Sequence, residues 1–130
     1  MAFNIDAVDK NAQKVGIWED MDGSSFRIAS ISQGSYQKRL TRLRKPYSRA
    51  IERETVNPDD LNGIFCKALA EHILVDWKDV IDGNGKEVEY SVTAAISVLQ
   101  DNDNFRDFVI EVASNQSLYE KQYKEAVVKK

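Results

Sequence analysis

The sequence has few of the residues that build disulfides, metal sites and turns. Its 130 residues include one cysteine, one histidine and two prolines. A single cysteine, Cys66, excludes an internal disulfide, and His72 has no second imidazole to join it in a zinc site. No apolar run approaches the roughly 20 residues that cross a bilayer. The N-terminus has neither the basic start nor the apolar core of a signal peptide. We therefore expect a cytoplasmic protein without a membrane span.

Motifs for catalysis are also missing. No glycine-rich phosphate loop follows a predicted strand, and no nucleophile elbow is present. The segment from Asp82 resembles a calcium loop at Asn84 and Lys86, but its sixth residue is Glu87 and its twelfth is Thr93, where the loop requires glycine and glutamate. We expect no catalytic residue, no bound metal and no cofactor, and we expect that the protein is not an enzyme.

Charge is plentiful and unevenly distributed. Charged residues make up 30% of the chain and hydrophobic residues 42%, which is ordinary for one globular domain. The net charge of −3 hides a basic segment from Tyr36 to Arg53, in which seven cations accompany one acid. Between Asn57 and Glu120, thirteen acids accompany four cations. Segments of opposite charge favour association between copies of the chain.

The N-terminal region predicts extended structure. Residues 1–14 are polar without a clear period, which indicates a flexible arm. Apolar residues alternate between about 15 and 31, and Asp22-Gly23 is a typical two-residue hairpin turn. A short hairpin is therefore expected, either packed on the helices or paired with the edge of another chain, because two strands alone are marginally stable.

The rest of the sequence predicts helices. Apolar residues repeat at helical spacing over 36–54, where Pro46 gives either a kinked helix or two short helices. Asn57-Pro58 begins a helix that is expected to run to about Trp77 at the centre of the core. Ser91 caps another helix, residues 101–104 separate it from the next, and a final helix begins at about Ser117. The predicted fold is mainly α, with about five helices and the hairpin in one domain over 15–130.

The basic helix over 36–53 is the candidate binding site. Three interpretations remain open: a face that is solvated or paired within the chain, a surface for an acidic protein partner or for self-association, and a surface for nucleic acid. An acidic chain, with a pI near 5.2, argues against nucleic acid. The candidate partner-binding residues are Lys38, Arg39, Arg42, Arg44, Lys45, Arg49 and Arg53, with Tyr36 and Tyr47 between them.

The second half of the chain resembles a known family in the order and spacing of several motifs. These motifs are Leu69-Ala70-Glu71, His72-Ile73-Leu74-Val75-Asp76-Trp77, Asp82-Gly83-Asn84-Gly85, Tyr90-Ser91 before Ala95 and Leu99, and Phe105-Arg106-Asp107-Phe108-Val109. In this they resemble the tail assembly chaperones of long-tailed, lambda-like siphovirus bacteriophages. No binding residue of that family can be carried over to a position here.

The resemblance implies a non-enzymatic chaperone that binds the tape measure protein and the major tail protein during tail morphogenesis. It also implies a protein that acts in the cytoplasm of the infected bacterial host and is not part of the mature virion. Family members commonly have a longer form made by programmed frameshifting, and the ending Val127-Val128-Lys129-Lys130 is compatible with such a site. Two alternatives stay open: a small nucleic-acid-binding regulator that uses helix 36–53, or another minor phage morphogenesis protein.

Overall fold

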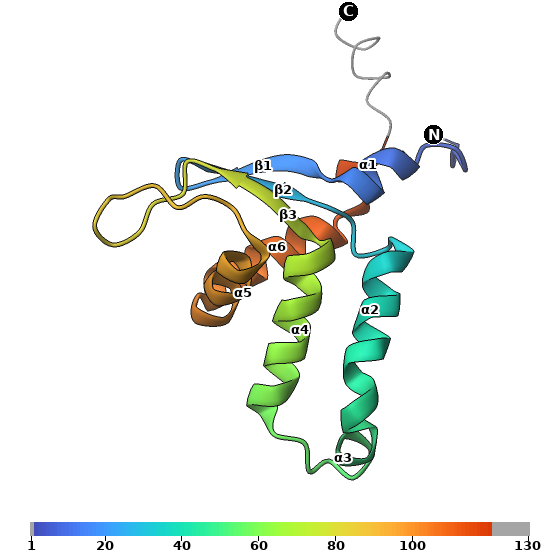
Figure 1. The fold of residues 1–130 in the computed structure, drawn as a ribbon. Coiled ribbons are helices and arrows are strands. Elements are labelled where there is room, and N and C mark those ends of the chain that lie inside the picture. Colours follow the sequence, from blue (N-terminus) through green and yellow to red (C-terminus); the bar gives the residue numbers. More distant parts are fainter. Residues whose placement is uncertain (1, 121–130) are drawn as a thin grey trace, which may run out of the picture.

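The computed structural model describes residues 2–120 of the chain. A three-stranded sheet lies over a group of helices (Figure 1). In chain order the elements are α1 (Lys10–Val15), β1 (Ile17–Met21), β2 (Ser24–Ile28), α2 (Gly34–Arg44), the 3-10 helix η1 (Lys45–Tyr47), α3 (Ser48–Glu52), α4 (Pro58–His72), β3 (Leu74–Lys78), α5 (Val92–Asp101), α6 (Asp103–Ser114) and the 3-10 helix η2 (Gln116–Tyr119).

The predicted N-terminal hairpin forms. Strands β1 and β2 pair antiparallel, with Met21 opposite Ser24 at the turn. Asp22 and Gly23 both have positive φ angles, 51° and 83°, as a hairpin turn of type I′ requires. The hairpin is only part of the sheet, however, because β3 pairs antiparallel with β2 in the order β1-β2-β3.

The prediction of a mainly α fold is wrong. Three antiparallel strands and several helices make the described part of the chain a mixed α/β fold. The error lies at residues 74–78, which were assigned to the end of a helix running to about Trp77. Helix α4 ends at His72, and the next residues form strand β3.

A β-bulge explains why this strand looked helical. Arg27 pairs with Asp76, but its neighbour Ile28 pairs with Leu74, so Val75 is an extra residue in β3. Leu74 and Trp77 are both buried, and the bulge places them on one face although they are three residues apart. Spacing of three is typical of one face of a helix, whereas a regular strand has a spacing of two.

Local capping signals place the starts of α4 and α5 where the sequence predicts them. The Asn57 side chain accepts a hydrogen bond from the Asp59 amide, and Pro58 occupies the first turn of α4. Ser91 caps α5 by accepting from the Ala94 amide. Pro46 divides the basic segment into α2, η1 and α3, which agrees with the predicted interruption.

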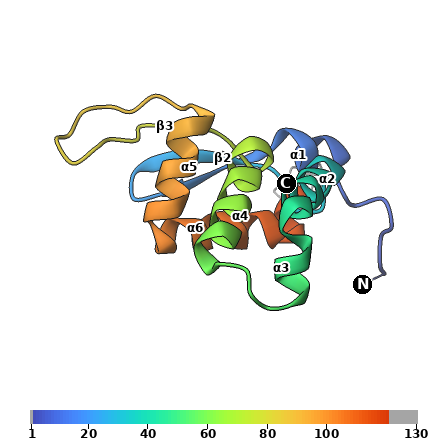
Figure 2. The same ribbon diagram turned by 60° about the horizontal axis from the view of Figure 1, so that its bottom comes forward.

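Helix α4 is central, as predicted. It packs against α2 on one side, α5 on the other and β3 at its end, and Figures 1 and 2 show it between α2 and α5. Phe26 of the sheet meets Phe105 of α6 with ring centroids 4.8 Å apart, so α6 also packs beneath the sheet. The fully buried large side chains include Ile28, Leu69, Ile73, Leu74, Leu99 and Val109.

The two ends of the described chain meet beside the hairpin. Residues 10–14 of the predicted flexible arm belong to α1, whose Gln13 is buried. The Asp9 amide donates to the Tyr119 carbonyl at 2.7 Å. Of the final helix predicted from about Ser117, the structure describes the short helix η2 and then Glu120, which is extended and forms an isolated antiparallel bridge with Val8. The rest of the predicted helix lies outside the described residues.

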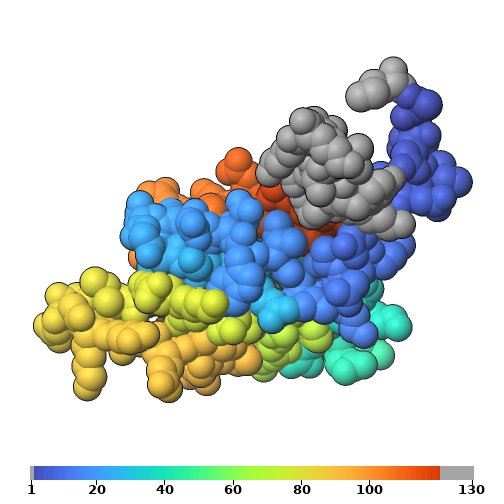
Figure 3. Space-filling view, turned by 90° about the horizontal axis from the view of Figure 1, so that it is seen from above, coloured from blue at the N-terminus to red at the C-terminus, as the bar shows by residue number. Residues whose placement is uncertain are grey.

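The sheet has an inner face, which packs on the helices, and an outer face on the opposite side (Figure 1). Seen from above, the hairpin forms this surface, and the connection between β3 and α5 extends beyond the body (Figure 3). Trp18 lies on the outer face, where the Lys78 ammonium is 4.4 Å from its ring centroid. The connection is anchored at its base, because the Trp77 indole donates to the Val88 carbonyl at 2.8 Å.

Candidate functional site

Most of the predicted basic residues lie on one exposed surface of α2, η1 and α3. Lys38, Arg42 and Lys45 are exposed and spaced four and three residues apart, which places them on the side of α2 away from the core. Arg49 and Arg53 continue the exposed positive charge along α3 and just beyond it. A shallow groove of about 820 Å³ runs along this surface, lined by Gln37, Lys38, Thr41, Arg42, Arg44, Lys45 and Ser48.

Arg39 has a different role. Its guanidinium binds the Glu71 carboxylate of α4 through two hydrogen bonds, of 2.6 and 3.2 Å. The two side chains are 26% and 23% exposed, so solvent screens the pair only partly. Arg39 therefore joins α2 to α4. Among residues 2–120, no carboxylate forms an ion pair with Lys38, Arg42 or Lys45, which together form a basic stripe.

The two tyrosines do not form an aromatic platform beside these cations. Tyr36 is 1% exposed and belongs to the core, and burial raises the pKa of its hydroxyl while the charge of Arg44 opposes the rise. Tyr47 is half-buried and packs against the same core. Stacking on nucleic-acid bases requires exposed ring faces, and this surface lacks them at Tyr36.

A second groove, not predicted from the sequence, lies between α2 and α4. It has a volume of about 350 Å³ and is lined by Leu40, Arg44, Leu61, Asn62, Ile64 and Phe65. Four of these side chains are apolar, and Arg44 places one cation at the edge that borders the basic groove. The half-buried state of Leu61 and Phe65, one helical turn apart, is the local sign that the groove is open to solvent.

A third hollow lies at the other side of the molecule, where the hairpin turn meets the corner between α5 and α6. Its volume is about 750 Å³. The apolar lining residues other than Ile81 are buried or half-buried and form its floor, whereas exposed acidic side chains and the exposed Ile81 form its rim, in contrast to the basic groove. The apolar lining residues are Met21, Phe26, Val80, Ile81, Val98 and Phe105, and the charged or amide residues are Asp22, Asp101, Asn102, Asp103 and Asn104.

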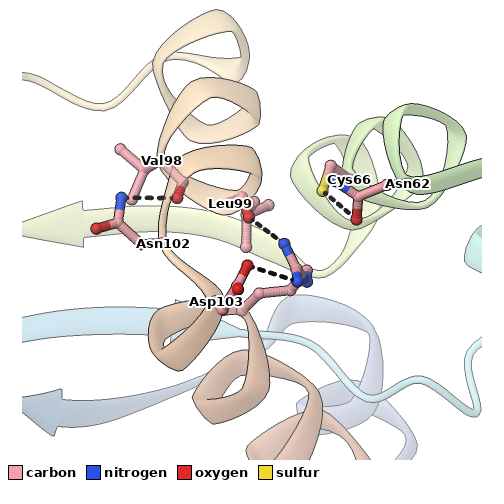
Figure 4. Close-up of polar contacts among 7 residues, drawn as sticks. Asn62, Cys66, Val98, Leu99, Asn102 and Asp103 are labelled. Carbon is pink, nitrogen blue, oxygen red and sulfur yellow. Dashed lines mark hydrogen bonds and ion pairs between the residues drawn. The ribbon is translucent and has the colours of Figure 1, made fainter. Parts of the chain in front are cut away.

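Hydrogen bonds fix the corner that forms this acidic hollow. Arg106 donates to the Leu99 carbonyl and to the Asp103 carboxylate, each at 2.9 Å. The Asn102 side chain donates to the Val98 carbonyl at 3.0 Å (Figure 4). The corner is therefore held by side chains of α6 and of the connecting residue Asn102, which bond backbone carbonyls of α5. Sequence reasoning recognised residues 101–104 as a helix boundary but not as part of a surface.

The residues considered for metal binding, Cys66, His72 and Asp82, each have a place in the fold. Cys66 is buried, and its thiol donates to Oδ1 of the Asn62 side chain at 3.8 Å (Figure 4). Burial raises the pKa of the thiol against the opposing charge of Arg106. His72 ends α4. The Asp82 carboxylate accepts from the Asn84 and Lys86 amides within its own turn.

The part of the chain that the structure describes has neither a cluster of metal-binding side chains nor a membrane-spanning helix. Residues 2–120 contain no group of three or more histidine, cysteine, aspartate or glutamate side chains placed to hold a metal ion. None of the helices in this range is both long and apolar enough to cross a membrane.

Comparison with known proteins identifies the family. No curated protein and no solved structure is similar enough to the chain to count as a match. The model of the YdaY prophage protein family matches residues 31–130, a region that begins just before α2 and includes both the basic surface and the α2–α4 groove. Because the match covers more than half of the sequence, this phage-derived chain belongs to the YdaY prophage protein family.

Proposed function

We propose that the protein is a phage tail assembly chaperone, which binds the tape measure protein and the major tail protein without catalysing a reaction. Membership of a prophage family supports a phage role, and the sequence resemblance to tail assembly chaperones supports the specific one. The proposal includes action in the cytoplasm of the infected host and release before the virion is complete.

The α2–α4 groove is the observation that carries the proposal. Between two antiparallel helices it presents the half-buried Leu61 and Phe65 over the buried Leu40 and Ile64, and the exposed Arg44 stands at its edge. Grooves of this kind bind the apolar face of an amphipathic helix, which inserts anchors at i, i+3 or i+4, and i+7. A cation at the edge favours a partner helix with acids beside its apolar stripe.

This chemistry suits an assembly chaperone. A partner that is still unassembled exposes apolar helix faces that would otherwise aggregate. A small groove covers such a face weakly, so the chaperone can dissociate when the tail subunits pack together. The proposal therefore predicts micromolar rather than nanomolar affinity for a single site, roughly 8 kcal/mol of binding free energy.

Binding to the tail proteins of the same prophage tests the proposal. Each is co-expressed with the wild-type protein and recovered as a complex, and its affinity is measured by isothermal titration calorimetry. Arg44→Glu is expected to weaken binding about tenfold or more, because it places a like charge against the acidic partner. Lys67→Glu, an exposed change on α4 outside the groove, is the matched control and should bind as the wild type does.

Two results would contradict the proposal: wild-type protein that binds neither tail protein, or Arg44→Glu protein that binds as tightly as the wild type. Detection of the chain in purified virions by mass spectrometry would instead favour a minor structural protein.

The basic groove gives a specific reason to test nucleic acid as well. Four cations line it and no carboxylate does, so it attracts anions. Gel retardation with mixed-sequence DNA at low salt is the direct measurement. Retardation that is lost in Arg42→Glu/Lys45→Glu protein would support the regulator, and its affinity should then fall steeply with salt. Unretarded DNA would exclude this function.

A further inference from the structure

The basic groove and the acidic hollow are complementary, and we propose that they bind each other between copies of the chain. The exposed stripe of Lys38, Arg42 and Lys45 on one molecule docks in the acidic hollow of the next. The hollow is formed by the hairpin turn, the start of the β3–α5 connection and the α5–α6 corner. This inference goes beyond the proposed chaperone function and does not depend on it.

The two surfaces lie on opposite sides of the molecule. Helix α4 separates α2 from α5, as Figures 1 and 2 show. The basic stripe faces outward from α2, while the hollow lies beyond α5, under the hairpin turn. A molecule cannot bring its own two surfaces together, so their partner must be another molecule.

The carboxylates of the hollow are available for such a contact. Among the described residues, neither Asp22 nor Asp101 has a hydrogen-bond or ion-pair partner for its side chain. Asp103 is paired with Arg106 but remains 81% exposed. The cations of the stripe likewise lack carboxylate partners within residues 2–120. Both surfaces therefore carry uncompensated charge of opposite sign.

The side chains of the stripe also match the apolar lining of the hollow. Lysine and arginine have aliphatic stems that pack on apolar surface while the charged ends stay at a polar rim. Met21, Val80 and the 63% exposed Ile81 offer that apolar surface. From Lys38 to Lys45 the helix rises about 10 Å, so the three cations form a compact group able to enter one hollow together.

A contact between two different surfaces is heterologous. A bound pair therefore still has a free basic stripe at one end and a free acidic hollow at the other. Repetition gives a ring if the rotation closes and an open filament if it does not. The α2–α4 groove opens on another side of α2. The assembly would therefore present one copy of that groove per subunit.

Reciprocal charge reversal tests the contact with the full chain. One variant reverses the stripe (Arg42→Glu/Lys45→Glu), a second alters the rim of the hollow (Asp22→Asn/Asp101→Lys), and a third combines all four changes. Asn is used at position 22 because it tolerates the positive φ angle there. The control, Lys10→Glu/Lys67→Glu, changes net charge as much as the stripe variant but at exposed residues elsewhere. Circular dichroism confirms that each variant folds.

Sedimentation velocity over a range of protein concentrations is the measurement. The wild type and the control should associate at about 0.1 M salt and dissociate at about 1 M, where the screening length falls to about 3 Å. The stripe variant and the rim variant should each remain monomeric, with association weakened about tenfold or more. Mixed together, these two variants should associate again, and the combined variant should associate by itself.

Recovery in the mixture and in the combined variant separates a specific contact from a loss of folding. The inference would be overturned by wild-type protein that stays monomeric at all concentrations tested, or by single-surface variants that associate as the wild type does. Folded variants that associate neither in the mixture nor in the combined form would also overturn it. None of these results depends on whether tail proteins bind.

Discussion

The buried hydroxyl of Tyr119 should contribute measurably to the stability of the fold. The Tyr119 side chain is completely buried, and its hydroxyl donates to the Ile28 carbonyl of β2 at 2.9 Å. Tyr119→Phe removes the donor and leaves that carbonyl without it, which costs about 1–3 kcal/mol for a buried group. We expect a loss of about 1.5 kcal/mol. The unfolding entropy of a 130-residue chain is about 0.27 kcal/mol/K, so the melting temperature should fall by about 5 °C.

The stability difference between the wild type and Tyr119→Phe should also depend on pH. Burial, and to a lesser extent the charge of Glu19, holds the pKa of Tyr119 well above its usual value of about 10. Below that value the tyrosine is protonated in both states, and its stabilising contribution is complete. Above it the unfolded chain loses the proton while the folded chain keeps it, so stability falls with rising pH. At pH 11 this loss is about 1.4 kcal/mol, and the difference between wild type and Tyr119→Phe should nearly vanish.

Urea unfolding followed by tryptophan fluorescence, at about pH 8 and about pH 11, measures both effects. Tyr47→Phe is the control, because the half-buried Tyr47 has no hydrogen-bond partner for its hydroxyl among the described residues; it should change stability by less than about 0.5 kcal/mol. The reasoning would be refuted if Tyr119→Phe matched the wild type at pH 8. It would also be refuted if the difference between the two proteins stayed constant up to pH 11.

Two further predictions concern a glycine with a positive φ angle and a helix cap. Gly16 has a φ of +99°, and an added Cβ would lie 3.1 Å from the Ile28 carbonyl carbon, so Gly16→Ala should cost about 1–3 kcal/mol in urea unfolding. The control Gly34→Ala adds its methyl group in open space and should not destabilise the protein; equal losses in both would contradict this reason. Asn57→Ala removes the side-chain cap of α4 and should lower the unfolding free energy by about 1 kcal/mol; an unchanged urea midpoint would show that the cap is dispensable.

The features predicted correctly are determined within a few residues. Asp22-Gly23 favours positive φ angles, Asn57 bonds an amide two residues ahead, and Ser91 bonds one three residues ahead. Each signal acts between a side chain and nearby backbone, so sequence alone contains the whole interaction. The hairpin turn and the starts of α4 and α5 were therefore predictable.

Strand β3 was not predictable in the same way. Its partner, β2, lies about 50 residues earlier, as the pairing of Arg27 with Asp76 shows. The bulge at Val75 gives the buried residues of β3 a helical spacing, and only Ile73 separates this strand from the end of α4. Periodicity therefore favoured one long helix, and only the long-range pairing decides between the two structures.

The candidate site was predictable in part. Exposed cations were recognised because charge is rarely buried without a partner, but the pairing of Arg39 with Glu71 and the burial of Tyr36 depend on how α2 packs against α4. The α2–α4 groove and the acidic hollow combine residues from separate elements. Such surfaces exist only after the elements are assembled.

The order β1-β2-β3 has a consequence for the boundaries of the family. The matched region begins at Ile31, yet two of the three strands and the core residues Phe26 and Ile28 come before it. A polypeptide cut at that boundary would keep β3 without a neighbour and expose the apolar side chains of Leu74 and Trp77. The unit of sequence similarity is therefore smaller than the unit of folding, and expression trials should retain the hairpin.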